Sequence, residues 1–270
     1  MKRRSRFLAL TCAAVMMAFV LAGCSKPTTE NPDPGDNQTP ENSDAKTYIV
    51  ASDTAFPPFE YMNTDTGKYV GFDLDILAAV AEDQNFKYEV QHIGFDPACN
   101  AVSAGQADAV IAGMTITEER QKDYDFSDGY YQNGQIMAVS ANSEIASMED
   151  LQGKIVAAKI GTMGTAYADA NKDKYGYTVK YYEDSPTMYE AVLNGANDAC
   201  FEDEAVMIYG IENGMAMKMV GEAVNFQPYG FAVKKGENSE LIQMFNDGLK
   251  NIRENGKYDE ILERYGLASE

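Results

Sequence analysis

The stretch Ala101-Val102-Ser103-Ala104-Gly105-Gln106-Ala107-Asp108-Ala109 decides the fold, because its pattern occurs twice in the chain. The second copy lies at 191–199 and repeats the Ala-Val pair, the glycine and the Asp-Ala ending at the same spacing. In each copy the glycine predicts the end of a helix, and Asp-Ala predicts the entry into a buried strand. The similar segments 49–53 and 155–159 precede these copies, and each predicts a strand that ends in a charged residue. The same order of elements, met twice, predicts two α/β lobes built on one plan.

The remaining periodicity supplies the other elements and returns the chain to its first lobe. Helical patterns around 240–253 and 258–265 are needed to cover that lobe, so we expect the chain to cross between the lobes twice. The predicted ranges are 46–131 and 230–270 for lobe 1, 135–225 for lobe 2, and 131–134 and 227–230 for the two crossings. Other predicted elements are a strand at 48–51, a helix over 76–81 with Asp73 as N-cap, a helix over 98–104 and a buried strand at 109–112.

Charged and polar residues follow several of the predicted strands. Three charged residues stand at the ends of predicted strands: Asp53, Lys159 and Asp203. Another predicted strand is followed by Gly113-Met114-Thr115. In open α/β sheets, ligands bind beyond the carboxyl ends of the strands. If the two lobes face each other, these groups converge on one cleft, which is therefore the predicted binding site.

Composition excludes several classes of function. The 270 residues include 42 acidic and 22 basic side chains, for a formal net charge of −20. A nucleic-acid partner requires a basic face, so we expect none. The single histidine, His92, is expected to end a strand at the surface without a partner, and neither a metal nor another cofactor is expected. Cys99 and Cys200 are expected to be buried free thiols.

The first 45 residues are predicted to direct and tether the protein. Basic residues precede an apolar run over 7–21, which at about 1.5 Å per residue is too short to span a bilayer and is typical of a secretion signal. The run ends in Leu21-Ala22-Gly23-Cys24, which resembles the bacterial lipobox. We therefore expect a signal peptide over 1–23, a lipid on Cys24 and a disordered tether over 24–45. The predicted location is the outer face of the cytoplasmic membrane.

The run Gly113-Met114-Thr115-Ile116-Thr117-Glu118-Glu119-Arg120 leaves a strand and predicts a helix with Thr117 as N-cap. Arg120 would then lie near the positive end of the helix dipole, where a cation is disfavoured. Either the neighbouring glutamates compensate it, or a ligand carboxylate does so by accepting two parallel hydrogen bonds from the guanidinium. The sequence pattern leaves both explanations open.

Four motifs that follow one another along the chain carry a family resemblance. One of them is the run 113–120 described above. The others are Asp53-Thr54-Ala55-Phe56-Pro57-Pro58-Phe59-Glu60-Tyr61, Val70-Gly71-Phe72-Asp73-Leu74-Asp75 and Asp125-Phe126-Ser127-Asp128-Gly129-Tyr130-Tyr131. Together they resemble the polar amino acid substrate-binding proteins of ABC importers over 48–268, the glutamine-binding branch in particular. The resemblance implies a type II periplasmic-binding-protein fold, capture of a polar L-amino acid by lobe closure, and delivery to a membrane permease with its ATPase. We expect a monomer.

The resemblance also implies a role for individual residues. Arg120 would bind the ligand α-carboxylate and Asp203 the α-ammonium group, while Asp53 and Lys159 would meet a side-chain amide. The full predicted site is Asp53, Phe56, Phe95, Ala112, Gly113, Thr115, Arg120, Lys159, Thr162, Met163, Gly164 and Asp203. Phe56 and Phe95 are its aromatic walls, and 162–164 supply backbone groups for the carboxylate.

The charges of this predicted site favour glutamine. One carboxylate and one ammonium group suit a neutral amide, whereas a charged side chain would meet one of them unfavourably. Arginine, lysine, histidine and cystine stay open, because Glu202 stands where the glutamine branch has histidine and Met163 stands where it has glycine. Two other functions also stay open. Prephenate and arogenate dehydratases share the fold, although no particular catalytic pair stands out here and we expect no enzyme. A sensory module would bind the same ligands without an importer.

Overall fold

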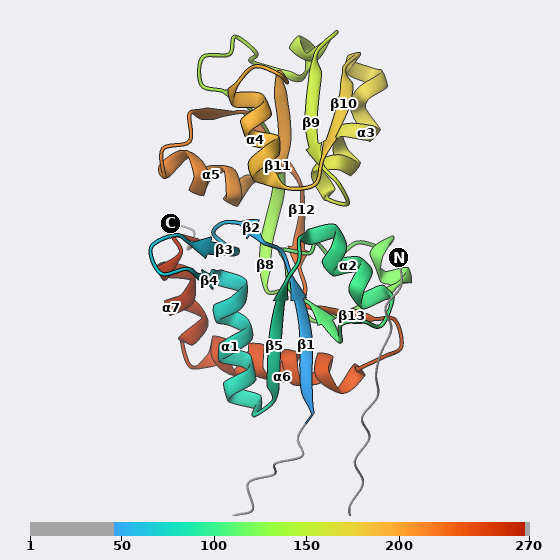
Figure 1. Ribbon diagram of the computed structural model, residues 1–270, viewed down its shortest axis with the longest axis vertical. Helices are drawn as coiled ribbons and strands as arrows, with labels where there is room; N and C mark the ends of the chain where they lie inside the picture. The colour runs from blue at the N-terminus through green and yellow to red at the C-terminus, as the bar shows by residue number, and fades with distance from the viewer. Residues whose placement is uncertain (1–45, 268–270) are drawn as a thin grey trace, which may run out of the picture. The chain divides into compact units, whose positions relative to one another are not determined.

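The computed structural model describes residues 46–267, so the predicted signal peptide, Cys24 and the tether lie outside the described residues. Two five-stranded sheets organise the described part, and helices pack against each of them (Figure 1). A third, three-stranded sheet is formed by β2 (Ala55–Phe56), β3 (Glu60–Asn63) and β4 (Lys68–Val70). No helix within 46–267 has the length and apolar character needed to cross a bilayer.

The first large sheet has the strand order β5-β1-β6-β13-β7. Its strands are β1 (Thr47–Ser52), β5 (Lys87–His92), β6 (Ala109–Val110), β7 (Tyr124–Phe126) and β13 (Ala232–Lys234). The first three run parallel, whereas β13 is antiparallel to both of its neighbours. The accompanying helices are α1 (Phe72–Gln84), α2 (Phe95–Ser103), α6 (Ser239–Glu254) and α7 (Lys257–Arg264). The C-terminal helices α6 and α7 both pack on α1.

The second large sheet has the order β10-β9-β11-β8-β12. Its strands are β8 (Tyr131–Ser140), β9 (Ile155–Lys159), β10 (Thr178–Tyr182), β11 (Ala199–Asp203) and β12 (Met217–Tyr229). The accompanying helices are α3 (Met163–Tyr175), α4 (Ser185–Leu193) and α5 (Glu204–Glu212). Two short 3-10 helices, η1 (Arg120–Lys122) and η2 (Met148–Leu151), complete the elements of the described residues. The long antiparallel strands β8 and β12 connect the two lobes (Figure 1).

The repeated sequence pattern corresponds to repeated structure. Gly105 and Gly195 follow α2 and α4 with φ of 70° and 77°, in the left-handed region that glycine adopts without strain. Three residues later, a carboxylate anchors β1 in the first sheet and β9 in the second. Asp108 Oδ2 accepts a hydrogen bond from the Ile49 N–H at 2.8 Å, and Asp198 Oδ2 accepts one from the Ile155 N–H at 2.9 Å. The aspartate before β6 therefore fixes the register of β6 against β1, and the aspartate before β11 fixes that of β11 against β9. This shared role is why the pattern recurs.

Four local predictions need correction. Asp73 is not an N-cap, because α1 begins one residue earlier, after Gly71. No α-helix begins at Thr117; the chain makes the short η1 instead, since it must enter β7 at Tyr124. The Thr117 hydroxyl still accepts a hydrogen bond from the Arg120 N–H, at 3.1 Å. The strand predicted over 109–112 is confined to β6, and the helix predicted over 98–104 begins at Phe95.

His92 ends β5, as predicted, but it has partners. Its ring stacks on Tyr69 with centroids 3.6 Å apart, and its Nδ1 lies 3.1 Å from the Asp53 carbonyl oxygen. A carbonyl oxygen only accepts hydrogen bonds, so Nδ1 carries the hydrogen. Cys99 and Cys200 are free thiols, as predicted; Cys200 is buried and Cys99 is partly buried. Burial raises the pKa of the Cys99 thiol to about 11.

Candidate functional site

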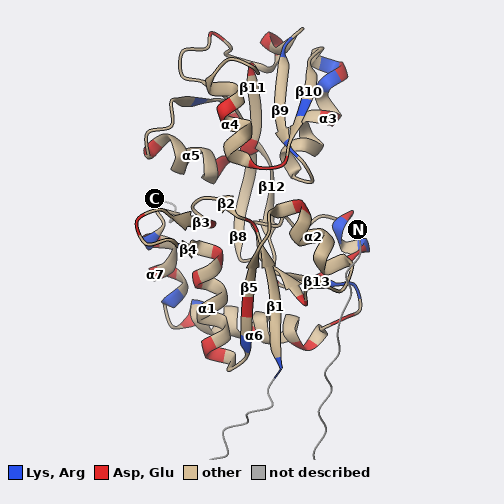
Figure 2. Cartoon of the chain, in the orientation of Figure 1, with Lys and Arg blue, Asp and Glu red and all other residues tan. Residues whose placement is uncertain are grey.

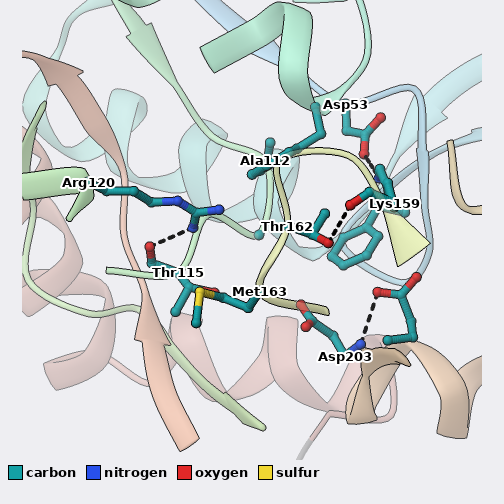
Figure 3. A pocket seen from close by; sticks show the side chains of 12 residues that line it. Asp53, Ala112, Thr115, Arg120, Lys159, Thr162, Met163 and Asp203 are labelled. Carbon is teal, nitrogen blue, oxygen red and sulfur yellow. Dashed lines mark hydrogen bonds and ion pairs between the residues drawn. The ribbon is translucent and has the colours of Figure 1, made fainter. Parts of the chain in front are cut away.

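A cavity of about 280 Å³ lies where the strand ends of the two large sheets meet (Figure 3). The cavity volume includes space open to solvent, and only about 10 Å³ of it admits the centre of a water molecule, so a larger ligand requires the walls of the cavity to move apart. Its lining residues are Asp53, Phe56, Phe95, Ala112, Gly113, Thr115, Arg120, Lys159, Thr162, Met163, Glu202 and Asp203. Both lobes therefore contribute side chains to the same small space.

Gly113 forms a wall of the cavity at the point where its backbone turns after β6. Its φ is +54°, and a Cβ at this position would lie 2.7 Å from Cε1 of Phe56, so only glycine fits without displacing the ring. The Gly113 N–H donates to Oδ2 of Asp73 at 2.7 Å, and the Tyr130 hydroxyl donates to the same oxygen at 2.7 Å. A buried carboxylate thus fixes the backbone against which Phe56 packs.

Arg120 is positioned by backbone carbonyls on both sides of the cavity. Its Nη1 donates to the Thr115 carbonyl oxygen at 2.7 Å, and its Nη2 donates to the Gly161 carbonyl oxygen at 2.9 Å. The guanidinium also lies over the Phe95 ring, 5.4 Å from the centroid, at a distance where a cation attracts the ring. Gly161 follows β9 of the second sheet, so this side chain bridges the two lobes. The remaining N–H groups are available to an anionic ligand.

Asp53 and Lys159 form a buried ion pair between the lobes. The Lys159 Nζ lies 2.5 Å from Asp53 Oδ2, and both side chains are only 2% exposed. Burial alone would lower the pKa of Lys159, but the negative charges of Asp53 and Glu202 outweigh it and raise that pKa. The ammonium group also lies 4.8 Å from the centroid of the Phe56 ring. The two charges neutralise each other, so this corner of the cavity presents a polar but neutral pair (Figure 3).

Asp203 ends β11 and is held by two side chains of the crossing strands. Gln135 Nε2 donates to Oδ1 and the Tyr229 hydroxyl donates to Oδ2. Burial, and next the charge of Glu202, raise the pKa of Asp203 to about 7, although both hydrogen bonds oppose the shift. Near neutral pH a proton therefore competes with any cationic partner for this carboxyl group.

Glu202 is buried beside Asp203, yet its carboxylate is fully engaged within the second lobe. Oε2 accepts hydrogen bonds from the Ser185 and Tyr189 hydroxyls, at 2.9 and 2.6 Å, and Oε1 accepts one from the Asp203 N–H at 2.9 Å. Three donors compensate one negative charge, which weakens its pull on a ligand.

The other acidic residues of the described part of the chain are distributed over both lobes, many of them on helices (Figure 2).

The N-terminus of α3 forms the remaining wall. Thr162 is its N-cap: Oγ1 accepts from the Thr165 N–H at 3.3 Å and donates to the Lys159 carbonyl oxygen at 2.7 Å. Met163 is the first helical residue, so unpaired backbone N–H groups and the positive dipole end lie at the cavity. With Arg120 opposite, this geometry suits a carboxylate. No cluster of three potential metal ligands occurs within 46–267.

Residues 48–268 match the family of bacterial extracellular solute-binding proteins, family 3. The chain belongs to this family. A probable histidine-binding protein of Neisseria gonorrhoeae is 32% identical over 85% of the chain and 87% of that protein. The glutamine-binding protein GlnH of an ABC transporter in Bacillus subtilis is 31% identical over 83% of the chain and 82% of that protein. A solved ancestral arginine-binding protein bound to glutamine superimposes with a TM-score of 0.76 at 37% identity, covering 82% of the chain and 98% of that structure. Its likeness confirms the type II periplasmic-binding-protein fold.

All residues predicted for the site of this solute-binding protein line the cavity except Gly164. A Cβ on Gly164 would lie 2.7 Å from the Phe201 carbonyl oxygen, so this glycine allows α3 to approach β11 rather than contacting the cavity. Glu202, which the sequence indicated only as a departure from the glutamine branch, does line it. The binding roles assigned to these residues remain predictions.

Gln135 and Tyr229 were missed, although they hold Asp203 in this solute-binding protein. Gln135 lies opposite Asp203 in the β8–β11 ladder, and Tyr229 is the last residue of β12. Both come from crossing strands far away in the sequence, and neither lies in a motif with a ligand-binding residue. Only the strand register, which the sequence did not reveal, could have identified them.

Proposed function

We propose that the chain captures a polar L-amino acid, with glutamine preferred, for an ABC importer. In this proposal Arg120 and the N-terminus of α3 bind the α-carboxylate and Asp203 binds the α-ammonium group. The observation that carries it is the separation of charge around one small cavity. Figure 3 places Arg120, Asp203 and the Asp53–Lys159 pair at three distinct places around that cavity. Those are the three contacts that a zwitterion with a polar side chain requires.

The neutral Asp53–Lys159 pair supports glutamine over charged amino acids. A side-chain amide can accept a hydrogen bond from Lys159 and donate one to Asp53, whereas a cationic side chain meets Lys159 and an anionic one meets Asp53. Glu202 does not reverse this preference, because its carboxylate already accepts three hydrogen bonds. Relatives named for histidine and glutamine keep the choice of side chain an experimental question.

Lobe closure is the proposed mechanism. Arg120 donates to Gly161 and Lys159 pairs with Asp53, so both contacts join residues of the two sheets across the cavity. A ligand held by Arg120 and Asp203 adds contacts of the same kind and shifts the population toward the closed form. We propose that lobe 1 spans 46–131 and 230–270 and lobe 2 spans 135–225, and that the monomer delivers its ligand to a permease and ATPase. A lipid on Cys24 would anchor it outside the cytoplasmic membrane.

Isothermal titration calorimetry across the twenty amino acids and cystine tests this proposal. Glutamine is expected to bind most tightly, and Arg120→Ala is expected to lose the binding. Glu118→Gln serves as a control, because Glu118 is exposed on the same loop and does not line the cavity. Wild-type affinity in Arg120→Ala would overturn the carboxylate assignment. Formation of phenylpyruvate from prephenate would instead favour an enzyme.

A further inference from the structure

Two buried acidic residues, Glu60 and Asp73, lie where α1 begins. The first turn of this helix docks on the segment that enters β3: the Phe72 N–H donates to the Pro58 carbonyl oxygen at 2.9 Å, and the Asp73 N–H donates to that of Phe59 at 3.0 Å. This docking places the carboxyl groups of Glu60 and Asp73 beside each other, so that the charge of Asp73 adds to burial in raising the pKa of Glu60. Both residues are 0% exposed.

If both groups are ionised carboxylates, three of their four oxygens have no hydrogen-bond donor among the described residues. Asp73 Oδ2 accepts from the Gly113 N–H and from the Tyr130 hydroxyl, but Oδ1 has no donor among the described residues. Neither carboxyl oxygen of Glu60 has one either. Buried acceptors without donors are costly, and two adjacent buried negative charges are more so. A single proton between the two groups removes one negative charge and gives Asp73 Oδ1 a donor, which leaves one oxygen of Glu60 without a partner among the described residues.

We propose that Glu60 retains its proton at neutral pH and donates it to Asp73 Oδ1, and that this shared proton makes Glu60 a positioning residue for the Gly113 wall of the ligand site. Asp73 is the partner that stays ionised, because it already receives two hydrogen bonds and lies in the first turn of a helix. The chain of contacts then runs from Glu60 through Asp73 to the Gly113 N–H, and Gly113 packs against Phe56 in the cavity.

The surroundings of Glu60 favour this distribution of the proton. Burial, followed by the charges of Asp73 and Asp53, raises the pKa of Glu60 well above its ordinary value, and only Lys159 opposes the shift. Burial also raises the pKa of Asp73, to about 6, which is still low enough to leave it ionised at pH 8. An ionised Glu60 would add negative charge beside the Asp53–Lys159 pair. The neutral form therefore preserves the charge balance that a neutral ligand side chain requires.

The test uses three variants of the whole chain. Glu60→Gln replaces the O–H donor with an N–H donor, and Glu60→Ala removes the donor. Glu89→Gln makes the same Glu-to-Gln change at an exposed position on β5 of the same lobe. Infrared spectra of ligand-free protein at pH 8 report protonated carboxyl groups directly. Hydrogen exchange of the Gly113 amide reports whether the wall is held. Calorimetry with the amino acid that the screen identifies reports the affinity.

We expect a protonated-carboxyl band in the wild type and in Glu89→Gln that is absent from Glu60→Gln. Glu60→Gln should keep its slow Gly113 exchange and stay within about twofold of wild-type affinity. Glu60→Ala should exchange faster and bind about tenfold more weakly, the usual effect of a buried acceptor that loses its donor. If Glu60→Ala does not fold, the wild type and Glu60→Gln still decide the question.

Equal infrared bands in the wild type and Glu60→Gln would overturn the shared proton. Equal losses of affinity and of Gly113 protection in Glu60→Gln and Glu60→Ala would overturn the positioning role. The affinity measurement rests on the proposed function, but the infrared and exchange measurements do not. A protein that binds no amino acid yet shows the Glu60 band would therefore refute the proposed function and leave the shared proton standing.

Discussion

Ligand binding is predicted to release a proton from Asp203. The pKa of this carboxyl group is raised to about 7, so at pH 7 about half of the empty protein carries the proton. An ammonium group requires the ionised form, because a protonated carboxyl group offers no charge to pair with. If binding ionises Asp203 completely, this group releases about 0.5 proton at pH 7, about 0.9 at pH 6 and about 0.1 at pH 8.

The same linkage fixes the direction of the pH dependence. Protons compete with the ligand ammonium group for Asp203, so affinity rises with pH until the empty site is ionised. With a pKa of about 7, the affinity at pH 6 is expected to be about tenfold below that at pH 8. Protein stability has the opposite slope: the native state holds the proton more tightly than the unfolded chain, so this group's contribution falls as pH rises from about 4 through about 7.

Calorimetry at pH 6 in two buffers with different heats of ionisation counts the released protons. Glu202→Gln is the informative variant, because the charge of Glu202 contributes to the raised pKa of Asp203. This variant should shift the affinity profile toward lower pH and release fewer protons at pH 7. Asp203→Asn should bind weakly and release none. Identical binding heats in both buffers at pH 6 would refute the assignment of the ammonium group to Asp203.

Three substitutions test other parts of the site. Arg120→Lys keeps the charge but not the planar fork, so we expect affinity to fall about tenfold or more by calorimetry; an unchanged Kd would exclude bidentate carboxylate binding. Lys159→Met leaves Asp53 buried without its counterion and should lower the free energy of unfolding in urea by about 3–5 kcal/mol. Adding Asp53→Leu should recover most of this loss. No recovery in the double variant would contradict the pairing. Gly113→Ala places a Cβ 2.7 Å from Phe56 at a φ of +54° and should cost about 1–3 kcal/mol of stability and weaken binding, whereas wild-type stability would show that the ring moves freely.

The sequence predicts the architecture well because the fold repeats. Asp108 anchors β1 and Asp198 anchors β9, each through a backbone hydrogen bond. The residues that fix the register therefore appear twice in the sequence at the same spacing. Strand ends were equally informative, since Asp53, Lys159 and Asp203 lie at the cavity that the topology predicts. The misplaced helix start at Thr117 shows the limit of local signals: N-cap chemistry was present, but the need to enter β7 overrode it.

The sequence could not reveal how these charged groups are compensated. Asp53 and Lys159 were each interpreted as contacts for a ligand, yet they bind each other, because only the approach of two lobes brings them together. Nor could Gln135 and Tyr229 be connected to Asp203, since they reach it through strand register rather than proximity in the chain. Long-range pairs of this kind depend on tertiary packing, which periodicity and motifs do not encode.

Compensation of charge also bears on the lobe closure that we propose. The Asp53–Lys159 pair is neutral, and at neutral pH Asp203 carries a proton in about half of the empty molecules. The remaining cation, Arg120, is held by two backbone carbonyls, so the empty site can dispense with a counterion from solvent. In the proposed binding mode, a zwitterion replaces the proton on Asp203 with its ammonium group and gives Arg120 a carboxylate. Because both gains arise from one molecule that contacts both lobes, a ligand lacking either end would exchange only one of these partners and stabilise closure less.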